Sequence, residues 1–566
     1  MKRSERKVAY YSMEIGLEPS IPTYSGGLGV LAGDTIRSFA DLKVPVVAVS
    51  LISEKGYFYQ KLNNVGEQTE EPVYWNPQDL LELLPEKVSV NIEGREVYIQ
   101  AWQYTVEGVS GSQVPVLFLD TNIPENDQEA RTLTTYLYGG DLTYRLAQEI
   151  ILGIGGFRML QKLGYTGIKK YHMNEGHSSL LALEMLRQLK EKREHSEKGQ
   201  DLWDIEEVRT RCVFTTHTPV PAGHDQFSYT IVEKVLGEFI PWEVLKKLGG
   251  QEFLNMTLLA LNLSRYVNGV ARKHGEISRK MFPGYPIDSI TNGVHVCNWT
   301  SSSFYRLYER YIQGWCNDPF ALRYSLAIPR EEIWEAHMES KRKMIDFVNQ
   351  NTNAGMSYHH LTIGFARRST AYKRVDLIFT DLQRLASISN KVGKIQLVFA
   401  GKAHPSDSRG KELIKKVFQH ARELKDSIKI AYLENYNIRT AKFLTSGVDL
   451  WLNTPKRPME ASGTSGMKVV MNGIPNFSIL DGWWLEGHIE GITGWSIGSR
   501  GIENQGDQDE RDARELYEKL EEVIVPQFYY EREKWIDVMR HSIAVNGSFF
   551  NTHRMVYEYT VNAYFL

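Results

Sequence analysis

The feature that most constrains this chain is a recurring order of two patterns. A short run of β-branched and apolar residues is followed by glycine, polar or basic residues, and then by a longer stretch with helical periodicity. The runs are VPVVAVSLI (44–52), RCVFTTHT (211–218), LTIGFAR (361–367), IQLVFAG (395–401) and SIKIAYL (427–433). Buried strands that alternate with helices form parallel sheets covered by helices. The pattern therefore predicts an α/β fold whose functional residues follow the carboxyl ends of the strands.

The length and the spacing of these units predict two lobes. A chain of 566 residues is longer than a single hydrophobic core supports. A second series of strand–helix units starts near residue 360, after a polar, helical stretch from about Arg330 to Asn353. We predict a first lobe over residues 1–355 and a second over 356–530, with a cleft between them. Residues 531–566 are helical and rich in aromatic side chains, so we expect them to pack back on the first lobe.

Charge and cysteine content narrow the partners and the compartment. The net charge of −3 does not indicate binding to nucleic acid or to an anionic membrane. The three cysteines, Cys212, Cys297 and Cys316, cannot close a disulfide framework, and no CxxC pair suggests a metal site. The N-terminus lacks the apolar core of a signal peptide, and no run is long enough to span a bilayer. We therefore predict a cytoplasmic protein with reduced thiols and no metal.

The segment EASGTSGMK, from Glu460 to Lys468, carries the most chemical information. A small, glycine-rich loop before a helix presents several backbone N–H groups, which suits a phosphate. A lysine in the first turn of that helix opposes the helix dipole, so it has no evident structural purpose. The dipole and burial would favour its neutral amine, which can bind an aldehyde covalently. These features outline a site for pyridoxal 5′-phosphate (PLP), although an ordinary turn before a surface lysine also fits the residues.

A second segment, RRSTAYKR, follows the predicted strand 361–366 and carries four cations: Arg367, Arg368, Lys373 and Arg374. Cations that gather at the carboxyl end of a buried strand form an oxyanion pocket by type. A solvated basic turn is the alternative interpretation.

Three weaker signals lie in the first half of the chain. The segment YSGGLGVLAGD (24–34) allows close approach of backbone to an anion at Gly26 and Gly27, but it matches no nucleotide-binding fingerprint. His217 follows a predicted strand, but a lone histidine is more often a satisfied core residue than a ligand, and the same holds for His177. No pair of carboxylates of the glycosidase kind is evident.

Together these segments resemble the α-glucan phosphorylases, the family that includes the glycogen, starch and maltodextrin phosphorylases. The blocks VAYYSMEIGL, SGGLGVLAGD, YHMNEGHSSL, TTHTPVPAGH, SITNGVHVCNW, FARRSTAYKR, FAGKAHPSD, LENYNI, EASGTSGMK and NGSFFNTHR occur in the family's order. The resemblance covers nearly the whole chain, and the EASGTSxMK block is its most specific part.

The resemblance implies a fold and a reaction. The fold is of the GT-B type, with two Rossmann-like lobes that face a central cleft. The reaction is retaining phosphorolysis of an α-1,4-glucan by inorganic phosphate, which yields α-D-glucose 1-phosphate and a shortened glucan. PLP is the implied cofactor, and its 5′-phosphate is the acid/base relay, which would explain why no carboxylate pair is present. A homodimer is the implied assembly.

The resemblance also implies roles for individual residues. Lys468 would bind PLP covalently, and the other cofactor ligands would be Gly463, Thr464, Arg367 and Tyr436. The glucosyl group and the substrate phosphate would lie against Gly26, Gly27, Arg368, Lys373, His217, Glu460 and Ser462. The catalytic set would be Lys468, Arg368, Lys373, His217 and Glu460.

Two departures and two rival interpretations remain. Longer members of the family have lysine where this chain has Arg367, and asparagine where it has Gly466. The chain is also short for the family, so we expect activity that does not respond to AMP or to glucose 6-phosphate. One rival is a nucleotide-sugar-dependent glucan synthase of the same fold, which would need no PLP lysine. The other is a glucan-binding relative without activity, which the loss of a clamp cation would indicate.

Overall fold

The computed structural model describes residues 1–194, 203–498 and 508–565, which form two compact units. The first unit comprises Met1–Phe58, Pro72–Ile290 and Met555–Leu566, and the second comprises Tyr59–Glu71 and Thr291–Arg554. No helix in the described part of the chain is both long enough and apolar enough to cross a bilayer.

The division between the units falls at other residues than the expected 355 and 530. Helix α12 (Arg330–Thr352) packs against α11 (Ser302–Tyr311) and α15 (Ile438–Gly447). Residues 291–355, which were expected in the first lobe, therefore belong to the second unit. Helix α20 (Arg532–His541) packs on α12 as well, and the chain rejoins the first unit only at Met555, inside α21 (Thr552–Tyr559). The amphipathic pattern of α12 does not reveal which of two cores the helix covers.

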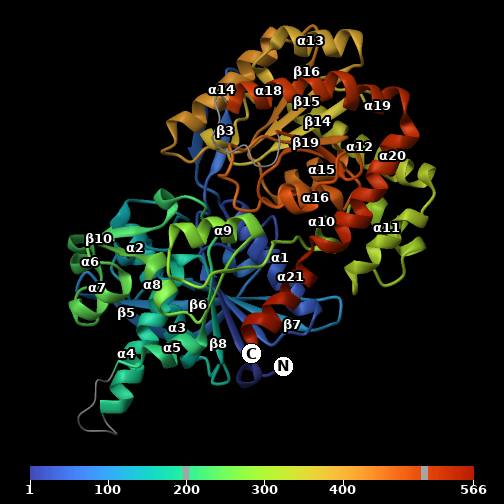
Figure 1. Ribbon diagram of the computed structural model, residues 1–566. Helices are drawn as coiled ribbons and strands as arrows, with labels where there is room; N and C mark the ends of the chain where they lie inside the picture. The colour runs from blue at the N-terminus through green and yellow to red at the C-terminus, as the bar shows by residue number, and fades with distance from the viewer. Residues whose placement is uncertain (195–202, 499–507, 566) are drawn as a thin grey trace. The chain divides into compact units, whose positions relative to one another are not determined.

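The first unit is built on a nine-stranded sheet in the order β13-β12-β9-β8-β1-β2-β7-β6-β5 (Figure 1). Neighbouring strands are parallel from β13 to β7, and β5, β6 and β7 pair antiparallel. The strands are β1 (Val8–Ser12), β2 (Val46–Leu51), β5 (Glu82–Ile92), β6 (Arg95–Glu107), β7 (Gln113–Asp120), β8 (Lys170–Asn174), β9 (Cys212–Thr215), β12 (Tyr266–Gly269) and β13 (Asp288–Ser289); β10 (Gln226–Ser228) and β11 (Phe253–Asn255) form a separate pair. The helices are α1 (Gly27–Asp41), α2 (Leu142–Ile150), α3 (Gly156–Lys162), α4 (Leu180–Glu194), α5 (Ile205–Arg211), α6 (Tyr229–Val235), α7 (Trp242–Gly249), α8 (Met256–Asn262) and α9 (Arg272–Met281).

Both faces of this sheet are buried at its centre, where every residue of β1 and β2 is buried, which explains why these strands read as continuous apolar runs. Along β1, Ala9 and Tyr11 enter one core cluster, whereas Val8 and Tyr10 enter the cluster on the other side. The second cluster also contains Tyr559 and other side chains of the C-terminal residues 555–564. The expected return of the aromatic C-terminus to the first unit therefore holds for these residues, and not for 531–554.

The second unit has a six-stranded, fully parallel sheet in the order β16-β15-β14-β17-β18-β19. Its strands are β14 (Leu361–Ala366), β15 (Ile395–Ala400), β16 (Lys429–Leu433), β17 (Leu450–Asn453), β18 (Asn476–Ile479) and β19 (Gly494–Ile497). Its remaining helices are α10 (Val296–Trp299), α13 (Leu382–Lys391), α14 (Ser408–Glu423), α16 (Ser465–Val470), α17 (Trp484–Gly487), α18 (Gln508–Lys519) and α19 (Val525–Tyr530). All five predicted strand runs form strands in these two sheets, so the α/β fold class is confirmed.

The second unit also contains a hairpin from early in the sequence, β3 (Tyr59–Leu62) and β4 (Gln68–Glu71). Two buried amides attach it to the loop after β15. Gln60 Nε2 donates to the Gly401 carbonyl at 2.9 Å, and Gln68 Nε2 donates to the Ala403 carbonyl at 2.8 Å. A segment that the sequence places among the strands of the first lobe is thus part of the second.

The cysteines differ from the expectation of three reduced thiols. Cys297 and Cys316 form a disulfide with a Cα–Cα distance of 6.0 Å, and Cys212 is free and buried. A sequence separation of 19 residues carries no signal of this pairing, because α10 and the turn after α11 bring the two residues together.

Candidate active site

The candidate site lies at the carboxyl edge of the second unit's sheet. Arg367 follows β14, Asn453 is the last residue of β17, and Asp481 follows β18 by two residues. Because these strands are parallel, their carboxyl ends share one edge, which is where ligands bind in such sheets.

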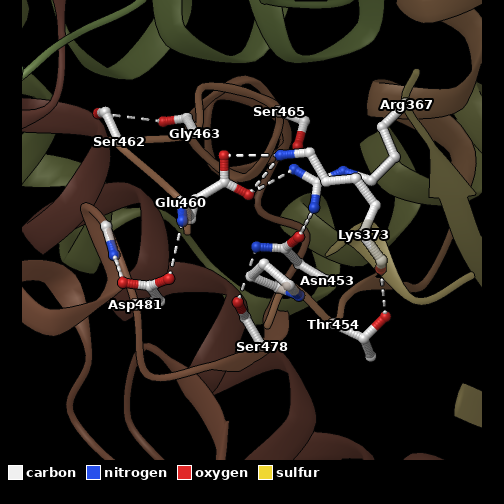
Figure 2. A network of polar contacts seen from close by, with 12 residues as sticks. Arg367, Lys373, Asn453, Thr454, Glu460, Ser462, Gly463, Ser465, Ser478 and Asp481 are labelled. Atoms are coloured by element: carbon white, nitrogen blue, oxygen red, sulfur yellow. Dashed lines mark hydrogen bonds and ion pairs between the residues drawn. The ribbon is translucent and has the colours of Figure 1, made fainter. Parts of the chain in front are cut away.

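Glu460 is the centre of a network of charges at this edge. Lys373 Nζ donates to both carboxylate oxygens of Glu460, at 2.8 and 2.7 Å, and Arg367 Nη2 donates to Glu460 Oε2 at 3.0 Å (Figure 2). Arg367 Nη1 also donates to Asn453 Oδ1. Burial alone would raise the pKa of the Glu460 carboxyl, but the two cations lower it to about 2. Glu460 is therefore an anion that balances two buried cations.

Asp481 holds the loop that carries Glu460. Its carboxylate accepts hydrogen bonds from the backbone N–H groups of Glu460 and Gly482, each at 2.9 Å. Gly482 has φ +54°, and an added Cβ would lie 2.3 Å from the Ser462 carbonyl oxygen, so only glycine fits there. Burial and the negative charge of Glu460 outweigh these hydrogen bonds and raise the pKa of Asp481 to about 7.

Lys468 lies in the helix that follows this loop. Helix α16 starts after Thr464, and the Thr464 carbonyl accepts from the backbone N–H groups of Met467 and Lys468. The preceding Gly463 has φ +74°, a conformation that favours glycine. The Lys468 side chain is buried rather than solvated, and its Nζ lies 4.2 Å from the centre of the Trp299 ring. A surface lysine is thereby excluded.

The glycine at position 466 has a steric reason. A Cβ at Gly466 would lie 2.4 Å from Asn476 Oδ1 and 2.9 Å from the Trp483 ring. The Asn476 side chain occupies that space and donates to the Gly466 carbonyl at 3.0 Å. An asparagine at 466 would therefore require Asn476 to move.

The other predicted residues of the second unit lie around this network. Arg368 is exposed and lines a pocket together with Arg367, Lys373 and Thr370. Ser462 and Gly463 continue from Glu460 toward α16, where the Ser462 carbonyl accepts from Trp483 N–H at 2.9 Å. Tyr436 lies three residues after β16, in a loop at the same edge of the sheet.

The remaining predicted residues belong to the first unit. Gly26 and Gly27 stand where α1 begins, and Glu14 Oε2 accepts from the Gly26 N–H at 3.1 Å. An added Cβ at either glycine would meet nothing within 4 Å, whereas at Gly33 it would lie 1.8 Å from the Gly16 carbonyl oxygen. Packing thus requires glycine at 33, and leaves open space beside 26 and 27.

His217 follows β9 by two residues, as predicted. Its Nε2 lies 2.7 Å from Asn174 Oδ1, and its backbone N–H donates to Glu175 Oε2 at 2.8 Å. Burial lowers its pKa to about 3, so the imidazole is neutral.

The structure thus joins Arg367, Lys373 and Glu460 directly, and it places Ser462, Gly463, Thr464 and Lys468 along the same segment. The sequence analysis missed Asn453, Asp481 and Glu14, which hold these groups. A signal existed for the first two, because each is a polar residue at the end of an apolar run, LWLN or FSIL. Nothing in the local pattern marks Glu14.

Several known proteins are similar in sequence to nearly the whole of this chain. The sequence model of the carbohydrate phosphorylase family matches residues 243–490. The chain is 39% identical to a maltodextrin phosphorylase of Thermococcus litoralis, over 99% of this chain and 70% of the relative. It is 35% identical to glycogen phosphorylases of Aquifex aeolicus and of Mycobacterium tuberculosis, over 98% of this chain and, respectively, 85% and 70% of those proteins.

Proposed function

Because the chain belongs to the carbohydrate phosphorylase family, we propose that it catalyses the phosphorolysis of α-1,4-glucans. The products are α-D-glucose 1-phosphate and a glucan shortened by one residue, with retention of the anomeric configuration. The observation that carries the proposal is the buried cluster of Lys373, Arg367 and Glu460 beside the segment that leads to Lys468. The names of the relatives, maltodextrin and glycogen phosphorylase, support glucans as substrates.

The residues around Lys468 fit PLP. A buried amine can bind the cofactor covalently without competition from solvent, and the Gly463–Thr464 turn presents backbone N–H groups at the start of α16. Arg367 adds a cation for the cofactor's phosphate, and Tyr436 lies in a loop at the same edge. When bound, PLP supplies a phosphate whose second pKa, near 6, suits proton exchange at neutral pH.

The cations of the second unit bind the substrate phosphate. Lys373 and Arg368 provide donors with fixed positive charge, and such charge-assisted hydrogen bonds are the strong ones. Lys373 Nζ donates to both oxygens of the Glu460 carboxylate, so an incoming phosphate would share this cation with Glu460. Glu460 keeps the cation oriented until the phosphate arrives.

Polar groups of both units are available for the hydroxyl groups of the glucan. Glu460 stays ionised at any working pH and accepts from glucosyl hydroxyl groups, and Ser462 adds a hydroxyl. His217 is neutral, and its Nε2–H donates to Asn174 Oδ1, so its Nδ1 can accept from one hydroxyl group. Gly27 provides a backbone N–H group at the start of α1, and both Gly26 and Gly27 lie next to open space.

A spectrum and a label test the proposal. The purified protein, reconstituted with PLP, should absorb in the near ultraviolet, and borohydride should attach PLP to the peptide that contains Lys468. Lys341 is the control, because it is also buried and its Nζ lies 2.6 Å from the Asp449 carboxylate. A label on Lys341, or no label at all, would contradict the proposal.

An assay separates the rival glucan synthase. Purified protein with maltooligosaccharide and phosphate should form glucose 1-phosphate, and in the reverse direction it should extend a glucan from glucose 1-phosphate. Extension from a nucleotide sugar, without PLP, would favour the synthase instead.

A further inference from the structure

Two carboxyl groups of the first unit share a single arginine. Arg145 on α2 lies 3.3 Å, through Nε, from Glu149 Oε1, and its Nη2 lies 2.8 Å from Asp225 Oδ2. The Glu149 side chain is completely buried, and three-quarters of the Asp225 side chain is buried. If both carboxyl groups were ionised, this buried cluster would hold two negative charges against one positive charge.

Another buried glutamate shows what an ionised carboxylate requires in this unit. Glu184 on α4 is equally inaccessible to solvent, and it accepts hydrogen bonds from Arg158, Arg187 and Gln188 at 2.8 to 3.1 Å. Burial raises the pKa of Glu184, but the two arginines lower it by more than burial raises it. The pKa of Glu184 is therefore below its ordinary value. Two cations and an amide thus stabilise one buried charge.

Glu149 has no such surroundings. Neither of its carboxyl oxygens has a hydrogen-bond partner among the residues that the structure describes. A buried, ionised carboxylate without donors costs several kcal/mol. A neutral carboxylic acid, in contrast, has an O–H that can donate to a neighbouring carboxylate.

We propose that Glu149 is a neutral acid whose O–H donates a hydrogen bond to the Asp225 carboxylate, and that this acid pair positions the turn at Gly26. The pair then carries one negative charge, which Arg145 balances. The pKa values agree in direction. Burial, with the added charge of Asp225, raises the pKa of Glu149 well above its ordinary value. Burial opposes ionisation of Asp225 too, but the positive charge of Arg145 lowers its pKa.

The other titratable groups around the pair leave this charge balance unchanged. Burial lowers the pKa of His177 to about 3 and that of His224 to about 4, so both imidazoles are neutral. Burial raises the pKa of Glu175, and Asp225 contributes to this shift. On α6, which also packs against α2, Glu233 and Lys234 are exposed to solvent.

A chain of contacts leads from the pair to the turn. The Arg145 guanidinium lies 4.4 Å from the centre of the Tyr138 ring, and Tyr138 OH donates to Glu14 Oε1 at 3.0 Å. Glu14 Oε2 accepts from the backbone N–H groups of Ser25 and Gly26, at 2.5 and 3.1 Å. A second negative charge beside Arg145 would draw the guanidinium away from Tyr138 and loosen this chain. Glu149 is therefore a positioning residue, and this step rests on the proposed function of the Gly26 turn.

Infrared spectroscopy tests the acid pair without an activity assay. The spectrum of the wild type minus that of Glu149→Gln should contain the C=O band of a protonated carboxylic acid at neutral pH, and the band should shift in deuterium oxide. The same difference for Glu184→Gln should contain only carboxylate bands. If the Glu149 difference lacks the acid band, or if Glu149→Gln does not fold although its amide can still donate to Asp225, the proposal is wrong.

Kinetics test the positioning. Glu149→Gln should keep the glucan KM within about two-fold of the wild type, whereas Glu149→Leu, which cannot donate, should raise it about ten-fold or more with a smaller change in kcat. Equal effects of the two substitutions would refute the positioning role. A protein that shows the acid band but no phosphorolysis would overturn the proposed function and leave the acid pair standing.

Discussion

At the scale of single residues, the positive and negative side chains of the candidate site neutralise one another. Glu460 neutralises Lys373 and Arg367, and Asp481 fixes the backbone of Glu460. A buried carboxylate that keeps two cations together prevents them from repelling each other before an anion arrives. Removal of one of these cations, or of the Glu460 carboxylate, should therefore affect the binding of phosphate more than it affects the fold.

The first residue-scale prediction concerns Lys373. Lys373→Ala removes a cation that donates twice to Glu460 and that is positioned for phosphate. By analogy with desolvated charge pairs, the loss of roughly 2–5 kcal/mol should lower kcat/KM for phosphate by about 30-fold to several thousand-fold. Lys416→Ala on α14, an exposed lysine whose ion pair with Asp376 is 3.4 Å long, is the control and should change little. Normal phosphorolysis by Lys373→Ala would contradict the assigned role.

A second residue-scale prediction concerns pH. Asp481 has a pKa of about 7 in the folded protein, above the ordinary value of 3.8. A raised carboxyl pKa contributes stability that is fully present below the ordinary value and is lost as the pH rises through about 7. Asp481→Asn removes this dependence. Thermal unfolding of both proteins from about pH 5 to about pH 8 should show the wild type losing stability relative to the variant. Parallel curves would show that Asp481 does not titrate in this range.

At the scale of secondary-structure elements, the β3–β4 hairpin is the attachment that supports the loop after β15. Gln68 both accepts from the Ala403 N–H, at 3.0 Å, and donates to the Ala403 carbonyl. Gly66 in its turn has φ +80°, and an added Cβ would lie 2.5 Å from the Phe418 ring. The hairpin thus satisfies backbone groups of a loop that adjoins Arg367 across the β14–β15 pair.

Gln68→Ala tests this attachment. The substitution leaves the N–H and the carbonyl of Ala403 without their partner, which should cost roughly 1–3 kcal/mol of the free energy of unfolding. Denaturant unfolding measures the loss. Lys61→Ala, an exposed position on the same hairpin, is the matched control and should stay within about 0.5 kcal/mol of the wild type. An equally small effect at both positions would show that the hairpin amides are not needed.

At the scale of the whole molecule, the chain is two compact units whose sequence segments interleave. The residues that fit PLP all belong to the second unit, so the cofactor should stabilise this unit first. PLP at about 100 times its Kd should add about 2.7 kcal/mol to the stability of the part that binds it. Hydrogen exchange should slow in the segment from Glu460 to α16 and remain unchanged in α8 of the first unit. Equal slowing in both would contradict a cofactor site built from the second unit alone.

The sequence by itself determined the local features. Apolar runs that alternate with amphipathic stretches are short-range patterns, so β2, β9, β14, β15, β16 and α12 could be predicted from them. The cations of 367–374 and the loop before Lys468 could be found for the same reason, since each is one continuous segment.

The tertiary structure alone decided which segments meet. Glu460 contacts Lys373 and Arg367 across 87 and 93 residues because β14 and β17 lie side by side in the sheet. The packing of elements into two hydrophobic cores also decides the strand order, the place of the β3–β4 hairpin in the second unit, and the proposed pairing of Glu149 with Asp225. The periodicity of apolar residues predicts that a side chain is buried, but it does not predict which side chain lies against it. The charge state of a buried group depends on that neighbour.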